Sequence, residues 1–328
     1  MIDRAHTADH VRRKIEALGT SMSLPTVAKA LGVLEGEHRS NRRGGNDDLL
    51  DIRPYEPGDE ARAIDWKISA RSGRAMVVQR ERLASGRVYL LMDAGREMTA
   101  SCPSGETAYA VAANALCMFA ALSLRRSDDV SLVLGDAASI TRVPFHGGLA
   151  QFERTLDRAL DRAWDHARNL DALLDYAVHL RDRDALVVIA SCEQALTRDH
   201  LPLIRRIART HPLVVIDVGT VNPFAAQPLD GVPRAHVVDG TSGRRVPALL
   251  RNEALAQETE RHRAFEVTSL TQELARCGAR LMHASSSARM FAGFVRLVSL
   301  SRFGAPGAPP CCARRRAKER SARERDCA

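Results

Sequence analysis

The sequence is poor in lysine and in aromatic residues. Only four of its 48 basic residues are lysines, and aromatic residues make up 4% of the 328-residue chain. This scarcity of aromatic side chains disfavours a surface on which nucleic-acid bases could stack. The other basic residues are arginines interleaved with acids, a pattern typical of a solvated surface. We therefore predict no nucleic-acid partner, despite a net charge of +8.

Motifs for several kinds of chemistry are also missing. The chain has no C-x-x-C pair, no G-x-x-x-x-G-K-[ST] phosphate loop, no H-E-x-x-H and no G-x-S-x-G. We therefore predict that the chain does not hydrolyse nucleotides by itself. Its seven cysteines are odd in number and irregularly spaced, and the charged N-terminal residues have no apolar core. These features predict reduced thiols in a cytoplasmic protein.

From residue 87 onward, short apolar runs alternate with helical patterns. The runs 88–92, 185–190 and 213–218 are typical of strands buried on both faces, and 279–284 is a further strand candidate. Residues 130–134 and 139–144 predict a hairpin. The helical patterns cover residues 106–125, 149–164, 170–181, 201–210, 249–277 and 288–303. This alternation predicts an α/β protein with a mostly parallel sheet and helices on both faces.

The most membrane-like segment is 108–124, which is rich in alanine and contains Asn114. It is shorter and less apolar than a typical membrane span, and a helix that is apolar all round can equally be buried against a sheet. We therefore predict a core helix and no stable membrane insertion.

Composition divides the chain into four parts. We predict an N-terminal helical segment at 1–35, a motif region at 36–85, an α/β domain at 86–303 and a disordered basic tail at 304–328. The tail has seven basic and three acidic residues, and its net charge of +4 is half of the total.

A dense motif, RPYEPGDEARAIDWKISAR, occupies residues 53–71. Its arginines and aspartates could form charge-assisted pairs, and Trp66 is large enough to anchor the segment against the domain. The motif is then a pinned loop. The other interpretation is a recognition surface for a partner protein. The segment has no histidine or cysteine, so nothing in it looks like a nucleophile beside a base.

This motif closely resembles the signature of domain of unknown function family 58, the von Willebrand factor A-like proteins associated with MoxR ATPases. The matching residues are Tyr55, Gly58, Asp59, Arg62, Ile64, Asp65, Trp66, Ser69, Ala70 and Arg71. Ten matches at fixed spacing are far more specific than a lone glycine motif, and the resemblance covers about residues 36–303. It implies a MoxR-type AAA+ ATPase and a client protein as partners. The candidate binding residues are Tyr55, Gly58, Asp59, Arg62, Asp65, Trp66, Ser69 and Arg71.

The resemblance also implies a von Willebrand factor A-like fold whose first strand ends in a metal-ion-dependent adhesion motif, Asp-x-Ser-x-Ser. Asp93 is present here, but Gly95 and Glu97 replace the two serines. Cys192 stands where a second aspartate is expected, and the loop 145–148 lacks the expected threonine.

Such a site is degenerate, and we predict that it needs no cofactor. The alternative is a Mg²⁺ site, because carboxylates are suitable hard ligands and Glu193 could supply a third one. The candidate metal-site residues are Asp93, Gly95, Glu97, Ser191 and Glu193.

These observations favour a non-enzymatic protein-interaction module that acts with a MoxR-type ATPase in protein assembly or maturation. The alternative is a divalent-metal-dependent hydrolase that uses the crevice at the strand ends. A third hypothesis is nucleic-acid binding driven by the arginines, which would depend steeply on salt.

Overall fold

The structure is a computed structural model, which describes residues 47–55, 64–82, 86–161, 165–182, 185–225, 238, 244–247 and 252–300. The predicted N-terminal segment 1–35 and tail 304–328 lie outside these residues. The motif residues Gly58, Asp59 and Arg62 lie outside them too.

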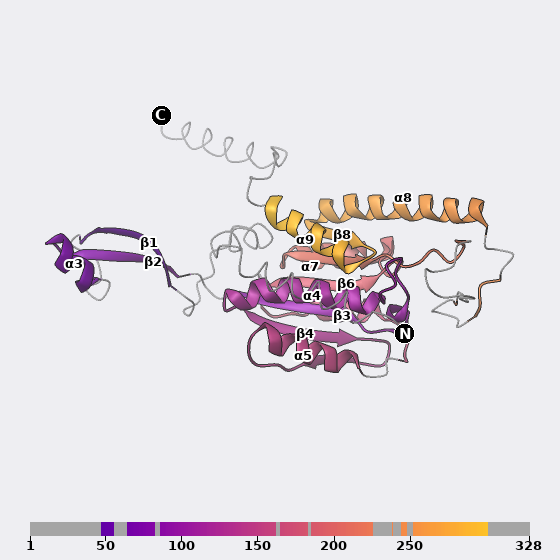
Figure 1. The fold of residues 1–328 in the computed structure, drawn as a ribbon, viewed down its shortest axis with the longest axis horizontal. Helices are drawn as coiled ribbons and strands as arrows, with labels where there is room; N and C mark the ends of the chain where they lie inside the picture. Colours follow the sequence, from indigo (N-terminus) through magenta and orange to yellow (C-terminus); the bar gives the residue numbers. More distant parts are fainter. Residues whose placement is uncertain are drawn as a thin grey trace, which may run out of the picture.

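A six-stranded sheet forms the centre of the molecule (Figure 1). Its strands are β3 (Arg87–Asp93), β4 (Asp129–Gly135), β5 (Ile140–Val143), β6 (Leu186–Cys192), β7 (Leu213–Val218) and β8 (Ala279–Ala284). The strand order is β5-β4-β3-β6-β7-β8, and only β5 at the edge is antiparallel to its neighbour. The predicted α/β class with a mostly parallel sheet is confirmed.

Helices cover both faces of this sheet. On one face lie α4 (Ala108–Arg125), α5 (Leu149–Leu160) and α9 (Ser287–Leu300). On the other face lie α6 (Leu170–Val178), α7 (Leu201–Ala208) and α8 (Glu253–Cys277). Strand β3 divides its side chains between the two cores: Leu90 and Met92 face α4, while Leu91 faces α6. This alternation explains why the strand is a continuous apolar run.

Helix α4 is the one described helix that is long and apolar enough to cross a membrane, but 78% of its apolar window is buried inside the protein. It packs against the sheet between α5 and α9, and Phe119 meets Phe294 of α9 edge to face at 5.0 Å between ring centroids. Its buried amide residue, Asn114, donates a hydrogen bond to Ser287 Oγ at 2.9 Å. The burial accounts for its apolar composition.

A small lobe precedes the sheet and stands apart from it in Figure 1. It consists of the antiparallel strands β1 (Asp47–Pro54) and β2 (Met76–Arg82) with the short helix α3 (Trp66–Ser72). The apolar pattern does not predict these strands, because both mix apolar and charged residues. The described residues of the family motif, 53–55 and 64–71, lie in this lobe.

Candidate functional site

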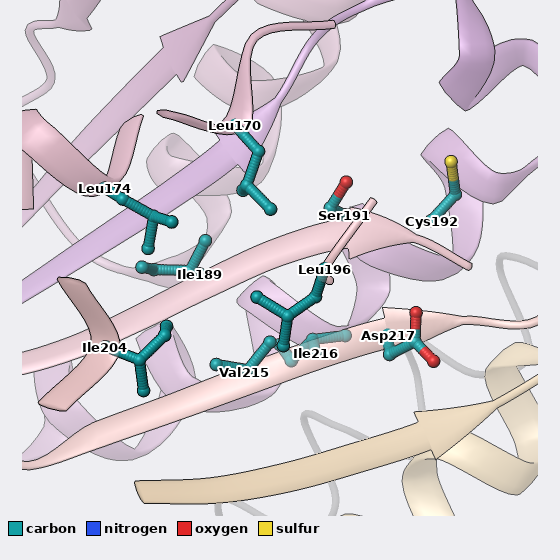
Figure 2. A pocket seen from close by; sticks show the side chains of 10 residues that line it. All are labelled: Leu170, Leu174, Ile189, Ser191, Cys192, Leu196, Ile204, Val215, Ile216 and Asp217. Atoms are coloured by element: carbon teal, nitrogen blue, oxygen red, sulfur yellow. The ribbon is translucent and has the colours of Figure 1, made fainter. Parts of the chain in front are cut away.

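The sheet has its topological switch point between β3 and β6, because the chain proceeds from β3 to β4 on one side and later returns to β6 on the other. In open α/β sheets, ligands bind outside the carboxyl ends of the strands at this point. Asp93 ends β3, and Ser191 and Cys192 end β6. Figure 2 shows Ser191 and Cys192 near the end of β6, with Asp217 near the end of the neighbouring β7.

Asp93 is fully buried at this switch point. Its Oδ2 accepts a hydrogen bond from Ser191 Oγ at 2.6 Å, and its Oδ1 accepts one from the Gly95 backbone at 2.9 Å. Burial raises the pKa of Asp93 above its ordinary value, while these hydrogen bonds and the nearby charge of Arg168 oppose the rise. Both carboxylate oxygens are thus engaged by the protein.

The segment 165–169, which precedes α6, closes over the end of β3. Arg96 N donates to the His166 carbonyl at 2.9 Å, and Arg168 N donates to Glu97 Oε2 at 2.8 Å. The Arg168 guanidinium also donates to Cys192 Sγ at 3.5 Å. A Cβ on Gly95 would lie 2.4 Å from the Arg168 Cα, so this close approach requires glycine.

This geometry corrects one prediction. The segment that meets the adhesion-motif residues is 165–169, whereas Phe145 of the loop 145–148 packs against Phe152 of α5. Arg168 was not among the predicted site residues, because only the folded chain brings it to Glu97 and Cys192. The available sequence signal is local: Asn169, the next residue, caps α6 through its Oδ1 and fixes where the segment ends.

The residues at this site do not fit a divalent cation. Asp93 has both oxygens engaged, Glu97 accepts from a backbone amide, and a guanidinium supplies positive charge to the crevice. Burial raises the pKa of Cys192 to about 12, so its thiol is neutral and a poor ligand for Mg²⁺. Within the described ranges, no group of three or more histidine, cysteine, aspartate or glutamate residues could hold a metal ion.

Glu193, a possible third ligand in the Mg²⁺ alternative, is engaged elsewhere. Its carboxylate pairs with Arg263 of α8 at 3.2 Å and accepts a hydrogen bond from Thr220 N, also at 3.2 Å. The space beneath Ser191 is no alternative ligand site, because it is lined by apolar side chains such as Leu170 and Ile189 (Figure 2) and its volume is about 10 Å³. That is room for about one water molecule.

In the lobe, two motif residues build the structure around α3. Asp65 caps the helix, with its Oδ1 accepting from Lys67 N at 2.9 Å and Ile68 N at 3.0 Å. Ser69 is buried, and its hydroxyl donates to the Asp65 carbonyl and accepts from Met76 N at 2.8 Å, which attaches α3 to β2. Asp65 therefore acts as a cap, and the described part of the lobe contains no ion pair between it and Arg71.

Other motif residues are turned to solvent. Trp66 is 71% exposed and Tyr55 is 38% exposed, and Arg71 is exposed as well. The prediction that Trp66 anchors the segment against the domain is therefore wrong. Large exposed aromatic side chains are typical of protein-interaction surfaces.

The strand order and the helices on both faces together define an α/β protein built on a mostly parallel six-stranded sheet. The chain belongs to the family described as "protein of unknown function DUF58", whose model matches residues 51–265. It is 27% identical over 304 residues to uncharacterized proteins of Mycobacterium tuberculosis and Mycobacterium bovis, which covers 89% of this chain and 91% of each relative.

Among solved structures, the chain is similar to the crystal structure of an aerotolerance-related membrane protein from Bacteroides fragilis with multiple mutations to serines. That similarity has a TM-score of 0.41 and 13% sequence identity, and it covers 66% of this chain and 100% of the other.

Proposed function

We propose that the protein is a non-enzymatic interaction module that binds a MoxR-type AAA+ ATPase through its β1-β2-α3 lobe and acts as an adaptor for a client protein. The observation that carries this proposal is the exposure of Trp66, 71%, in the motif that is most specific to the family. A tryptophan left in water is unfavourable for the isolated chain, and burial against a partner removes that apolar surface from solvent.

Some motif residues hold α3 in place while Trp66 faces solvent, and this arrangement supports the same proposal. Asp65 and Ser69 hold α3 on β2, and Gly73 ends the helix with a left-handed φ of 70°. The helix thus presents Trp66 from a fixed position. A rigid aromatic side chain on a short, well-anchored helix is a suitable hot spot for a protein partner.

The chemistry at the switch point favours binding over catalysis. Asp93, Glu97 and Arg168 use their polar atoms to join β3, β6 and the segment 165–169. The hydrolase alternative requires a metal or a free nucleophile, and the buried Cys192 thiol has a raised pKa.

The test is the affinity of the full-length protein for the purified MoxR-type ATPase of the same organism, measured by calorimetry or surface plasmon resonance. We expect Trp66→Ala to weaken binding by at least about tenfold, or about 1.4 kcal/mol. Because the side chain is mostly exposed, the same substitution should change the free energy of unfolding by no more than about 0.5 kcal/mol.

The matched control is Lys67→Ala, which alters the next exposed position of α3. Its affinity should stay close to that of the wild type. Charge reversal at Asp65 is unsuitable as a test, since it removes the cap of α3. Wild-type affinity in a folded Trp66→Ala protein would exclude the lobe as the contact surface.

A further inference from the structure

A second hollow lies beside the switch point, at the carboxyl ends of β6, β7 and β8. It is a cleft of about 680 Å³ between the middle of α8 and the first turn of α9. Its floor contains Glu193, Thr220 and His283, and Arg289 of α9 lines its other side. Clefts of this volume are the size that accommodates small-molecule ligands.

His283 is held in a defined orientation in this cleft. Its Nδ1 lies 2.8 Å from Asp217 Oδ2, so Nδ1 carries the proton that it donates to the carboxylate. The opposite edge of the ring lies against Gly219, where a Cβ would come within 3.2 Å of Nε2. The absence of a side chain at Gly219 therefore leaves room for the Nε2 edge of the ring, which lines the cleft.

Two charges in the wall are largely buried and balance each other. Glu193 and Arg263 pair at 3.2 Å with side chains that are 9% and 11% exposed, and Arg263 also donates to the Thr220 carbonyl at 2.9 Å. Glu260 of α8 also lines the cleft; it is exposed, and its carboxylate accepts a hydrogen bond from the neutral Asn222 amide at 3.0 Å, so the α8 side of the cleft keeps a negative charge opposite Arg289 of α9. These groups are fixed in place by their mutual contacts.

Arg289 differs from the paired Arg263, because its charge is not balanced by an ion-pair partner within the described residues. It is exposed, and no carboxylate of the described residues forms an ion pair with its guanidinium. Its backbone amide donates to Ser286 Oγ at 3.2 Å, which leaves the Ser286 hydroxyl proton available for a ligand. Ser285 lines the same edge of the cleft. The mouth therefore offers a cation and hydroxyl donors beside the oriented imidazole.

We propose that this cleft binds a small anionic ligand bearing a phosphate or carboxylate group, with Arg289 and the imidazolium of His283 as its charge partners and Ser285 and Ser286 as hydrogen-bond donors. The hydrogen bond to Asp217 raises the pKa of His283 above its ordinary value, which favours the cationic ring. A guanidinium and an imidazolium donate charge-assisted hydrogen bonds to either type of anion. The proposal is independent of the lobe and of the ATPase.

The experiment is an NMR titration of full-length protein with labelled histidine, using inorganic phosphate and succinate as separate probes at constant ionic strength. The His283 resonances are identified as those missing from His283→Gln. We expect at least one probe to shift them saturably, and the effective probe tells whether the ligand group is phosphate or carboxylate. Arg289→Gln should weaken that binding by about tenfold or more.

The control is Arg280→Gln, which removes an exposed arginine near the amino end of β8, away from the cleft. Its binding should match that of the wild type. The proposal is overturned if neither probe shifts the His283 resonances saturably. It is equally overturned if Arg289→Gln and Arg280→Gln bind the probe with wild-type affinity.

Discussion

Gly95 illustrates how one small residue can determine what a site is able to do. Its position corresponds to a serine of the adhesion motif that the family resemblance implies, and a side chain there would overlap the backbone of Arg168. Glycine in place of the serine is therefore what allows the segment 165–169 to approach the end of β3, so the two features depend on each other. They replace a hydroxyl by a chain segment that carries its own positive charge.

This coupling predicts the effect of Gly95→Ala. The new Cβ would meet the Arg168 Cα and N at 2.4 Å, and both are backbone atoms that cannot rotate away. We expect a loss of about 1–3 kcal/mol in the free energy of unfolding, typical of overpacking in a buried place. Urea unfolding of the two proteins measures this difference.

The comparison for Gly95→Ala is Gly293→Ala in α9, where a Cβ meets nothing within 4 Å. Alanine is the better helix former, so this variant should gain about 0.5–1 kcal/mol. If the free energy of unfolding falls for Gly95→Ala and rises for Gly293→Ala, the loss at Gly95 is due to steric overlap and not to a general effect of replacing glycine. Equal stability of wild type and Gly95→Ala would show that the segment 165–169 can move away without loss.

At the scale of the element, α3 is only seven residues long and depends on its ends. Isolated helices of this length are unstable in water. The Asp65 cap, the Ser69 hydrogen bonds and the left-handed Gly73 therefore supply much of what keeps it folded. Since the lobe stands apart from the sheet, its stability is expected to be local (Figure 1).

We therefore expect Asp65→Ala to loosen α3 without affecting the sheet. Removal of a cap costs about 1 kcal/mol, which corresponds to about fivefold faster exchange of the protected amides. Hydrogen exchange of the Lys67 and Ile68 amides measures the effect directly. Exchange in β3, for example at Leu90, serves as the internal control, and equal acceleration there would mean that the lobe and the sheet unfold together.

The elements of the sheet domain could be predicted well from the sequence. The runs at β3, β6 and β7 are apolar because both faces of each strand are buried, and α8 ends at Gly278 with a left-handed φ of 86°, as its pattern indicates. Strands β1 and β2 mix apolar and charged residues, so their composition carries little signal.

The candidate site was less predictable for a physical reason. Asp93 and Ser191 follow from their positions at strand ends, and the structure joins them by a hydrogen bond. Arg168 and the pairing of Glu193 with Arg263 depend on where connecting segments meet in space. No spacing in the sequence encodes those contacts.

At the scale of the whole molecule, stability should depend on pH through the His283–Asp217 pair. The hydrogen bond that His283 Nδ1 donates to Asp217 raises the pKa of His283 above 6.5 in the folded protein. The stabilising contribution is therefore fully present below pH 6.5 and is lost as pH rises through the folded pKa. Because the ring is partly exposed, solvent screening keeps this contribution modest.

Asp217→Asn tests this dependence, since asparagine retains a hydrogen-bond acceptor but has no charge. We expect the free energy of unfolding of the wild type to fall more steeply between pH 6 and pH 9 than that of the variant. Urea unfolding at intervals of one pH unit gives both curves. Parallel curves over this range would mean that the pair does not influence global stability.

The guanidinium of Arg168 has one more consequence, for how the molecule is regulated. An ion-dependent adhesion site can be switched off by withdrawing its cation, but here the positive charge beside Asp93 is covalently part of the polypeptide. Binding of a partner at this end of the sheet should therefore persist in EDTA and should not depend on the cellular concentration of magnesium or calcium. Release of the partner then requires a different energy source.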